Sequence, residues 1–280
     1  MKTSFIRYIF VFAVILLSVE KSDARNVQDT TKTEQNCKVD KEYFKLFWPG
    51  FKGVITEPVR WSKGEYIAAG SILAAGGILY TQDLRIADFF QKHRTEQLDK
   101  LNEYFFDPFG KMYYTIPLMA GFYTYGAFAK KDKPKAVAMD FVRASLYSGV
   151  IVTVMKHLAH RHRPYQTDPR NPYLWDGPFT DDWNHTSFPS GHTIMAWTFA
   201  SVLANHYKDK LWVPITVYSI ATMEGVARMY ADKHWSTDVL IGAALGYAIG
   251  TYVVKHSHCK FDVFPVAGLG FTGFGVKIPL

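Results

Sequence analysis

Six long apolar segments constrain the fold of this chain more than any other feature of its sequence. They are rich in Ala, Gly, Leu, Ile and Tyr, and none shows the alternation of a half-buried strand. They lie at about 66–82, 112–129, 137–156, 191–206, 211–228 and 237–254. We therefore expect an all-α protein, an antiparallel helix bundle with about six core helices.

A charged stretch at 83–111 separates the first two apolar segments. It carries apolar residues at helix-like spacing: Ile86, Phe89, Phe90, Leu98, Leu101, Tyr104 and Phe105. We expect this stretch to pack across one end of the bundle. A lid or a membrane-surface segment is the alternative.

Residues 1–24 have the composition of a secretory signal peptide. Lys2 and Arg7 form a basic start before an uncharged, mostly apolar run, and Ser22 and Ala24 offer small side chains at the cleavage spacing. A short uncleaved anchor remains the alternative.

The rest of the chain divides into three parts. These are an irregular leader or short interfacial helix at 25–60, a helical-bundle domain at 61–258 and a C-terminal tail at 259–280. The tail alternates Phe and Val with several glycines, which predicts a small β-hairpin.

The chain contains two cysteines, Cys37 near the predicted mature N-terminus and Cys259 after the last apolar segment. In an oxidising compartment they would link the two ends of the domain. Two separate thiols are an equally good interpretation of the sequence.

The composition excludes some classes of protein. A hydrophobic content of 48% with 16% aromatic residues excludes a disordered chain. The net charge of +7 comes from scattered Lys and Arg, without zinc-finger spacing or a DNA-reading helix. We expect no nucleic-acid partner, and instead a basic surface that faces phosphate esters or lipid headgroups.

Two cations lie near the end of the third apolar segment. Lys156 and Arg163 are seven residues apart, so a helix would place them on one face, roughly 10 Å apart along its axis. Pro164 would end that helix immediately afterwards.

A phosphate-binding helix start follows in the sequence "FPSGH". Ser190 has the chemistry and the position of an N-cap for the fourth segment. The backbone N–H groups of Gly191 and His192 would then be unpaired donors, which bind phosphate well.

The third stretch is "ARMYADKHWSTD", which contains Arg228, His234 and Asp238. The fourth and fifth segments are joined by only a few residues and should run antiparallel, so Arg228 returns to the end where the fourth segment begins. His234 and Asp238 open the sixth segment at that same end. We therefore expect all three stretches to meet.

Together these residues suit phosphoryl transfer through a histidine. His234 is the predicted nucleophile, Asp238 orients its ring, and His192 is placed to protonate the leaving oxygen. The predicted phosphate-binding residues are Lys156, Arg163, Ser190, Gly191 and Arg228. Because these fixed donors neutralise the phosphate, we expect no metal and no cofactor to be needed.

The combined pattern K-x6-R-P, P-S-G-H and R-x5-H-x3-D resembles the type 2 phosphatidic acid phosphatase family, whose core is shared with acid phosphatases and vanadium haloperoxidases. The resemblance implies the same roles for the residues named above, and a phosphatase acting on phosphomonoesters or pyrophosphates. It also implies a phosphorylated lipid as substrate: phosphatidic acid, an isoprenyl pyrophosphate or lipid A. A vanadium-dependent haloperoxidase is the alternative function.

One position departs from the family pattern. Ala227 stands where a Ser usually precedes the third-motif Arg. The loss of one phosphate hydrogen bond would cost up to ~1–2 kcal/mol without threatening the mechanism.

The loop at 165–187 and its surroundings contain further histidines and carboxylates. They are His157, His160, His162, Asp176, Asp181, Asp182 and His185. Their spacing matches no familiar zinc or calcium pattern, so solvated loop charges are the favoured interpretation.

Two topological signals conflict. Basic loops at 130–135 and 208–210, if cytoplasmic, would place the site outside, whereas an exported N-terminus followed by six spans would place it inside. The uncharged runs at 66–82, 112–129 and 239–254 measure only 17, 18 and 16 residues, below the ~20 that a membrane span needs. We therefore expect a helical domain in the periplasm, peripheral on the membrane surface. An inner-membrane protein whose site faces the periplasm is the alternative.

Overall fold

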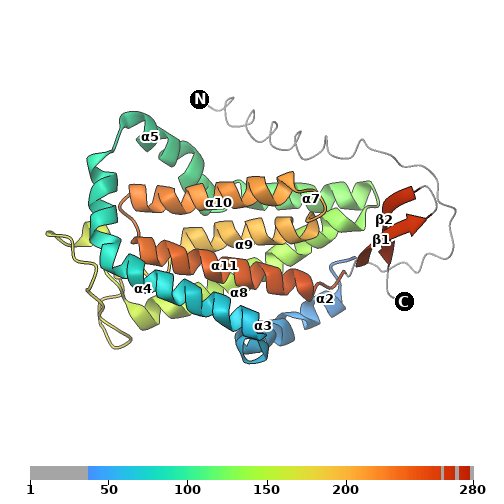
Figure 1. Cartoon of the computed structure of the whole chain (residues 1–280), viewed down its shortest axis with the longest axis horizontal. Helices are drawn as coiled ribbons and strands as arrows, with labels where there is room; N and C mark the ends of the chain where they lie inside the picture. The colour runs from blue at the N-terminus through green and yellow to red at the C-terminus, as the bar shows by residue number, and fades with distance from the viewer. Residues whose placement is uncertain (1–36, 260–261, 269–270, 278–280) are drawn as a thin grey trace.

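The computed structural model describes residues 37–259 and the backbone of 262–268 and 271–277, so the predicted signal peptide lies outside the described residues. Long helices dominate and run side by side along one axis (Figure 1). They are α4 (Lys63–Lys92), α7 (Thr115–Phe128), α8 (Asp132–Ala159), α9 (Gly191–His206), α10 (Trp212–Tyr230) and α11 (Ser236–Lys255). Each predicted apolar segment forms one of them, and the all-α fold class is confirmed.

Helix α9 forms the centre of the bundle. It packs against α8, α10 and α11, and most of its residues are buried. The core around it consists of aliphatic and aromatic side chains, among them Val137, Phe141, Ile194, Phe199, Leu203, Val217, Ile249 and Val253. Burial of this apolar surface is the main stabilising term of the fold.

A stripe of glycines on α11 lets α9 and α11 approach closely. A Cβ on Gly246 would lie 2.4 Å from the carbonyl oxygen of Ile194, and one on Gly242 would lie 2.8 Å from that of Ser190. Any larger residue at these positions would push the two helices apart. This contact sets how the N-terminal ends of α9 and α11 face each other.

Residues 41–60 are helical rather than irregular. They form α2 (Lys41–Lys45), α3 (Phe47–Thr56) and the 3₁₀ turn η2 (Glu57–Arg60). Some of the aromatic side chains of this region pack on the bundle: Tyr43 is buried, and the ring of Phe51 lies 5.6 Å from that of Tyr147. Phe44 and Trp48 are exposed.

Cys37 and Cys259 form a disulfide with a Cα–Cα distance of 5.5 Å, and both are buried. Of the two alternatives that the sequence leaves open, a disulfide and two separate thiols, the structure has the disulfide. The bond joins the chain before α2 to the chain after α11.

The charged stretch 83–111 serves two purposes. Its first part continues α4 to Lys92, and its second part forms α5 (Glu96–Leu101), the π-helical turn η3 (Asn102–Phe106) and α6 (Asp107–Gly110). These short elements contact α9 and α10 and lie across one end of the bundle (Figure 1).

The long loop after α8 occupies the same end of the bundle. It contains the turn η4 (Pro164–Gln166) and an isolated antiparallel bridge between Arg161 and Trp175. At the C-terminus, β1 (Asp262–Gly268) pairs antiparallel with β2 (Phe271–Lys277). Residues 269–270 between them lie outside the described residues, so the hairpin stays a prediction.

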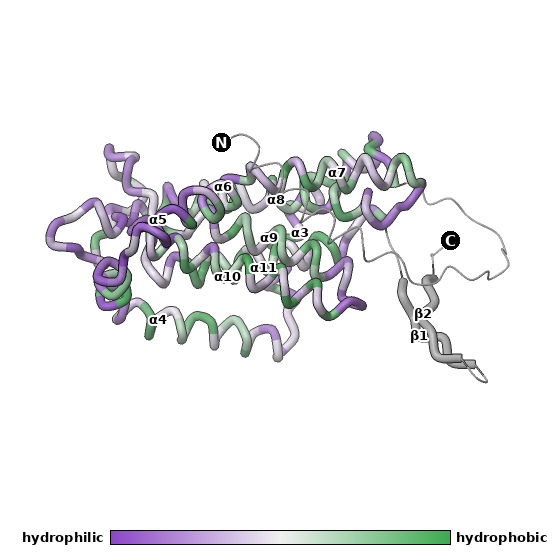
Figure 2. The backbone as a smooth tube through the Cα atoms, turned by 90° about the horizontal axis from the view of Figure 1, so that it is seen from above, coloured by the Kyte–Doolittle hydropathy of each residue, from purple (hydrophilic) through white to green (hydrophobic). Residues whose placement is uncertain are grey.

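Along the middle of the bundle the long helices consist largely of hydrophobic residues, whereas the end with α5 is rich in hydrophilic residues (Figure 2). On α8, one outward stripe consists only of exposed aliphatic residues: Val142, Leu146, Val150, Val154 and Leu158. By length and composition, α8 and α11 are the described helices that are apolar enough to cross a membrane. Exposed apolar surface of this extent is typical of a contact with lipid or protein.

Candidate active site

The eight predicted site residues lie at one end of the bundle. Lys156 is in the last turn of α8, Arg228 in the last turn of α10 and His234 just before α11. Arg163, Ser190, Gly191, His192 and Asp238 occupy the loop after α8 and the starts of α9 and α11. The topological argument from the sequence thus agrees with the structure in bringing these stretches together, while the chemical roles of the residues remain predictions.

Asp238 is close to His234 but does not hydrogen-bond to it. The distance from His234 Nδ1 to Asp238 Oδ2 is 3.7 Å, and the buried Nδ1 has no hydrogen-bond partner. Instead, Oδ2 of Asp238 accepts from the Ser187 hydroxyl at 2.5 Å and from the Trp235 N–H at 2.9 Å. A small rotation of the His234 ring would complete the expected contact.

His234 is held neutral by its surroundings. The pKa of this histidine is lowered to about 3, first by burial and then by the nearby charges of Lys156 and Arg163, while Asp238 acts in the opposite direction. A neutral imidazole retains the free lone pair that a nucleophile needs.

Lys156 and Arg163 converge on one residue of the long loop. The Lys156 ammonium donates to the Thr186 carbonyl, and Arg163 Nη2 donates to the Thr186 hydroxyl at 3.3 Å. Gly191 lies against the same lysine, because a Cβ there would be 3.6 Å from Lys156 Cε. The two cations and the first turn of α9 therefore border one space.

The start of α9 is capped as predicted. The Ser190 hydroxyl accepts from the Thr193 N–H at 3.4 Å, and Ser190 N–H donates to the Asp238 carbonyl at 3.0 Å. This second bond ties the start of α9 to the first turn of α11. The cap leaves the amides of Gly191 and His192 at the N-terminal end of the helix, where anions bind favourably.

Arg228 is surrounded by acceptors that the sequence analysis did not identify. Its Nη1 donates to Asp107 Oδ1 at 2.8 Å, its Nη2 donates to Asn102 Oδ1 at 3.0 Å, and its Nε lies 3.0 Å from Glu224 Oε1. His192 Nε2 is 3.9 Å from the same oxygen of Asp107. Asp107 therefore lies between the cation and the predicted general acid.

The pKa of His192 is lowered to about 4, first by burial and then by the charge of Arg228, with Asp107 acting in the opposite direction. Arg163 also lowers the pKa of His192, as it does that of His234. One guanidinium thus acts on both histidines, which places them around a common electropositive space.

A buried ionic network beneath the site was also missed. Arg161 is fully buried and donates to Asp238 Oδ1 at 2.6 Å and to Asp83 Oδ2 at 2.7 Å. Asp83 accepts in turn from the Ser236 hydroxyl at 2.6 Å and from the Thr237 N–H at 3.0 Å. The sequence offered one sign of this network, the carboxylate of Asp83 directly after the uncharged run 66–82.

The loop histidines and carboxylates separate into two groups. His157 and His160 pack their rings against Trp183, with centroid distances of 4.8 and 5.9 Å. His162, Asp176 and His185 instead bring one ligand atom each to within 4.8 Å of one another. The second group is therefore joined by contacts within the loop, and its interpretation as solvated loop charges stays a prediction.

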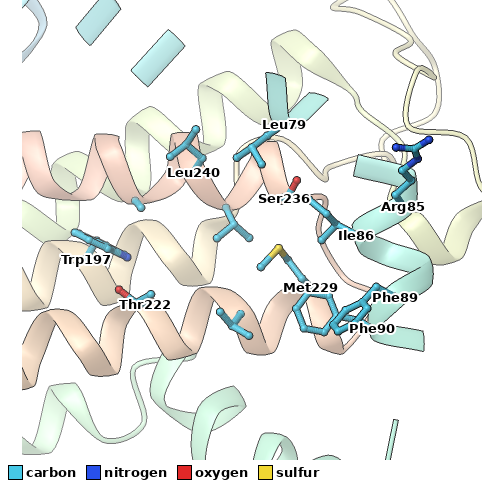
Figure 3. Close-up of a pocket in the computed structure, with 13 residues that line it drawn as sticks. Leu79, Arg85, Ile86, Phe89, Phe90, Trp197, Thr222, Met229, Ser236 and Leu240 are labelled. Atoms are coloured by element: carbon cyan, nitrogen blue, oxygen red, sulfur yellow. The ribbon is translucent and has the colours of Figure 1, made fainter. Parts of the chain in front are cut away.

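An apolar cavity of about 530 Å³ lies beside the catalytic end (Figure 3). Its walls come from α4, α10 and α11, with Trp197 from α9. The lining includes Leu79, Ile86, Phe89, Phe90, Val226, Met229, Ser236, Val239 and Leu240. Met229 adjoins Arg228 in the chain and Ser236 is two residues from His234, while no predicted site residue lines the cavity itself.

Comparison with known proteins gives a family match for one region of the chain. Residues 137–260, which include every predicted site residue, match the model of the PAP2 superfamily. This region of the chain is therefore similar to the PAP2 superfamily.

Individual relatives match parts of this protein. It is 37% identical over 65 residues to lipid A 1-phosphatase of Porphyromonas gingivalis, covering 23% of this chain and 15% of that protein. It is 27% identical over 152 residues to probable diacylglycerol pyrophosphate phosphatase 1 of Schizosaccharomyces pombe, covering 44% and 54% of the two chains. The matches thus span a small part of the first relative and about half of the second.

Two solved structures are similar to the chain. LpxE from Aquifex aeolicus gives a TM-score of 0.48 at 27% identity, covering 62% of this chain and 94% of that one. The first transmembrane PAP2 type phosphatidylglycerolphosphate phosphatase from Bacillus subtilis gives a TM-score of 0.45 at 22% identity, with coverages of 77% and 94%.

Proposed function

We propose that this protein is a phosphatase that hydrolyses phosphomonoesters or pyrophosphates carried on lipids. The observation that carries the proposal is the placement of two neutral histidines and three cations around one space at the end of the bundle. The similarity of residues 137–260 to the PAP2 superfamily supports the same reading. Lys156 and Arg163 both donate to the uncharged Thr186, and a bound anion would compensate their like charges.

In the proposed reaction the phosphate binds among Lys156, Arg163 and Arg228 and the first-turn amides of α9. Arg228 offers its guanidinium for two-point contacts with phosphate oxygens, and Lys156 acts as a point charge. For Arg228 to do so, the substrate must displace Asp107 or share the arginine with it.

The chemical step then has two parts. Binding of the negatively charged phosphate favours the protonated form of His192, which takes up a proton from solvent. Nε2 of His234 then attacks phosphorus, the bond from phosphorus to the leaving oxygen breaks, and protonated His192 gives its proton to that oxygen. Water next attacks the phosphohistidine, gives a proton to His192, and the P–N bond breaks to release inorganic phosphate. Asp238 stabilises the positive ring of His234 between the two steps.

A lipid-linked substrate is favoured by the apolar cavity beside the site. Its volume of about 530 Å³ falls within the range of small-molecule pockets, and its lining is almost entirely apolar. An acyl or isoprenyl chain lying there would place its phosphate near the cations. The names of the curated relatives, a lipid A 1-phosphatase and a probable diacylglycerol pyrophosphate phosphatase, agree with this substrate class.

We place the reaction outside the cytoplasm, at a lipid surface. The disulfide Cys37–Cys259 is typical of an oxidising compartment, and the exposed aliphatic stripe of α8 is suited to contact with lipid. The periplasm is the compartment that combines both properties.

The nucleophile assignment is tested with His234→Ala in purified protein in detergent. We expect phosphate release from phosphatidic acid, undecaprenyl pyrophosphate and lipid A to fall to background, while the melting temperature stays within a few degrees of the unmodified protein. His93→Ala, at an exposed histidine of the α4 C-cap, serves as the matched control and should retain full activity.

Two further outcomes bear on this proposal. Release should persist in excess chelator, because the fixed cations neutralise the phosphate. Turnover by His234→Ala at the unmodified rate would refute the nucleophile, and a loss in chelator that magnesium restores would refute the cation-based mechanism.

A further inference from the structure

We propose that His162, Asp176 and His185 form a binding site for a divalent transition metal, with Zn²⁺ the best fit. The site lies in the long loop beside the phosphate-binding residues and is separate from them. It would act as a clamp that joins two segments of the loop. The proposal does not depend on the phosphatase function.

The three side chains are already directed at one another. His162 Nε2 lies 3.0 Å from Asp176 Oδ2, and His185 Nδ1 lies 2.6 Å from the same oxygen. Zinc bound by nitrogen and oxygen at about 2.0–2.1 Å with tetrahedral angles separates its ligand atoms by roughly 3.3 Å. Small side-chain rotations would therefore open the group to accept the ion.

The backbone around the site is held by hydrogen bonds. The His162 N–H donates to the Leu174 carbonyl at 3.1 Å, and the Asp176 N–H donates to the His160 carbonyl at 3.1 Å. A third bond, from the Ser187 N–H to the Arg161 carbonyl at 2.9 Å, fixes the segment that carries His185. The ligands are thus placed by a small framework of paired backbone.

The second nitrogen of one imidazole supports a metal rather than isolated charges. The rings of His162 and His185 stack at a centroid distance of 3.4 Å, so one ring must turn out of the stack before both lone pairs point at one ion. The second nitrogen of His185, Nε2, faces Asp182 Oδ2 at 3.7 Å. Metal-bound histidines commonly direct their second nitrogen to a carboxylate in this way.

The ligand types select the metal. Two imidazoles and one carboxylate suit zinc and its neighbours, whereas Ca²⁺ and Mg²⁺ prefer oxygen ligands. The side chains of His162, Asp176 and His185 are 15%, 31% and 17% exposed, so water can complete the coordination. When Nε2 of His162 binds the metal, the proton of the ring is on Nδ1, which is buried without an acceptor. This unpaired N–H would weaken metal binding by about tenfold, so we expect micromolar rather than nanomolar affinity.

The clamp would act on the phosphate site through chain neighbours. Arg163 follows His162, and Thr186, which accepts hydrogen bonds from Lys156 and Arg163, follows His185. A metal that joins His162 to His185 would therefore hold both segments at a constant separation.

The test is calorimetric titration of ZnCl₂ into the full-length protein in detergent after metal removal with a chelator. We expect one equivalent to bind to the unmodified protein and to His256→Gln, a matched control at an exposed histidine outside the cluster. Asp176→Asn and His185→Gln should each lower the affinity at least tenfold, with Mg²⁺ producing no heat in any variant.

Zinc-edge X-ray absorption of the unmodified, zinc-loaded protein provides a measurement that does not depend on variants. It should show nitrogen and oxygen ligands with two imidazoles. Absence of zinc uptake by the unmodified protein, unchanged affinity in Asp176→Asn and His185→Gln, or a spectrum without imidazole would each overturn the proposal.

Discussion

At the residue scale, the site depends on carboxylates that direct the cations and histidines. Asp238 receives its hydrogen bonds from Arg161, Ser187 and the Trp235 amide, and so it cannot move freely toward or away from His234. Asp107 accepts a hydrogen bond from the Arg228 guanidinium. The two carboxylates therefore act differently. Asp238 is held in place by hydrogen bonds next to His234, whereas Asp107 competes with phosphate for Arg228.

Removal of the charge of Asp107 should strengthen anion binding. Asp107→Asn eliminates a negative charge next to Arg228 and His192, and a gain of about tenfold in the affinity for orthovanadate is expected from the reduced repulsion. The measurement is the inhibition constant of vanadate. Asp99→Asn, which alters a carboxylate paired with Arg94 at 2.8 Å in the same stretch, should leave that constant unchanged.

Weaker vanadate binding by Asp107→Asn would contradict this expectation. It would mean that Asp107 mainly holds Arg228 in position for the anion.

His192 should make the fold sensitive to acid. Its pKa is about 4 in the folded protein against an ordinary value of 6.5, so the unfolded chain takes up a proton first as the pH falls. Its contribution to stability is complete above pH 6.5 and is lost as the pH falls through about 4. The amount is roughly 1–2 kcal/mol, because the side chain is partly open to solvent.

Thermal unfolding between pH 7 and pH 4 checks this expectation. His192→Asn should lose less stability than the unmodified protein over that interval, because other acid-sensitive groups are common to both. Equal losses would show that His192 titrates normally in the folded state.

At the element scale, the close approach of α9 and α11 determines the geometry of the site. These helices carry Ser190, Gly191 and His192 on one side and Asp238 on the other. Their separation is limited by glycines on α11, because backbone atoms of α9 lie where a side chain would be.

Gly246→Ala should destabilise the protein by about 1–3 kcal/mol and reduce activity. The added Cβ would meet the Ile194 carbonyl at 2.4 Å and the Thr198 nitrogen at 2.9 Å, neither of which can move without shifting α9. Gly70→Ala in α4 is the matched control, with nothing within 4 Å of the new atom. It should be neutral or stabilise by about 0.5–1 kcal/mol through helix propensity.

Chemical denaturation of both variants measures these changes in the free energy of unfolding. Equal effects of the two substitutions would show that the bundle adjusts to the additional methyl group.

At the scale of the whole molecule, the disulfide joins the two ends of the described bundle. Cys37 and Cys259 are separated by 222 residues, so the bond restricts nearly the whole unfolded chain. Cys37→Ser with Cys259→Ser should lower the free energy of unfolding by about 2–5 kcal/mol. Thermal unfolding with and without reductant is the measurement, and reductant should affect the unmodified protein but not the double variant.

An unchanged melting temperature in the double variant would indicate that packing of α2 and α3 alone holds the N-terminal part. Tyr43 offers such packing, since its hydroxyl donates to the Met139 carbonyl at 2.7 Å.

The sequence by itself determined the helical architecture and predicted which residues would meet at one end of the bundle. Apolar segments of helical length can bury their surface only as a bundle, and the order of the three motifs along antiparallel helices brings them to one end. These properties follow from local periodicity and chain direction, both of which can be read from a single sequence.

Only the tertiary structure decided which other groups complete the site. Arg161 reaches Asp238 across 77 residues and Asp83 across 78 residues, and Asp107 reaches Arg228 across 121 residues. The cluster of His162, Asp176 and His185 is formed by irregular backbone. The same applies to the disulfide, because whether two distant thiols meet depends on the packing of every helix between them. Long-range contacts leave no periodic signal in the chain, since they depend on how the helices dock rather than on their spacing in sequence.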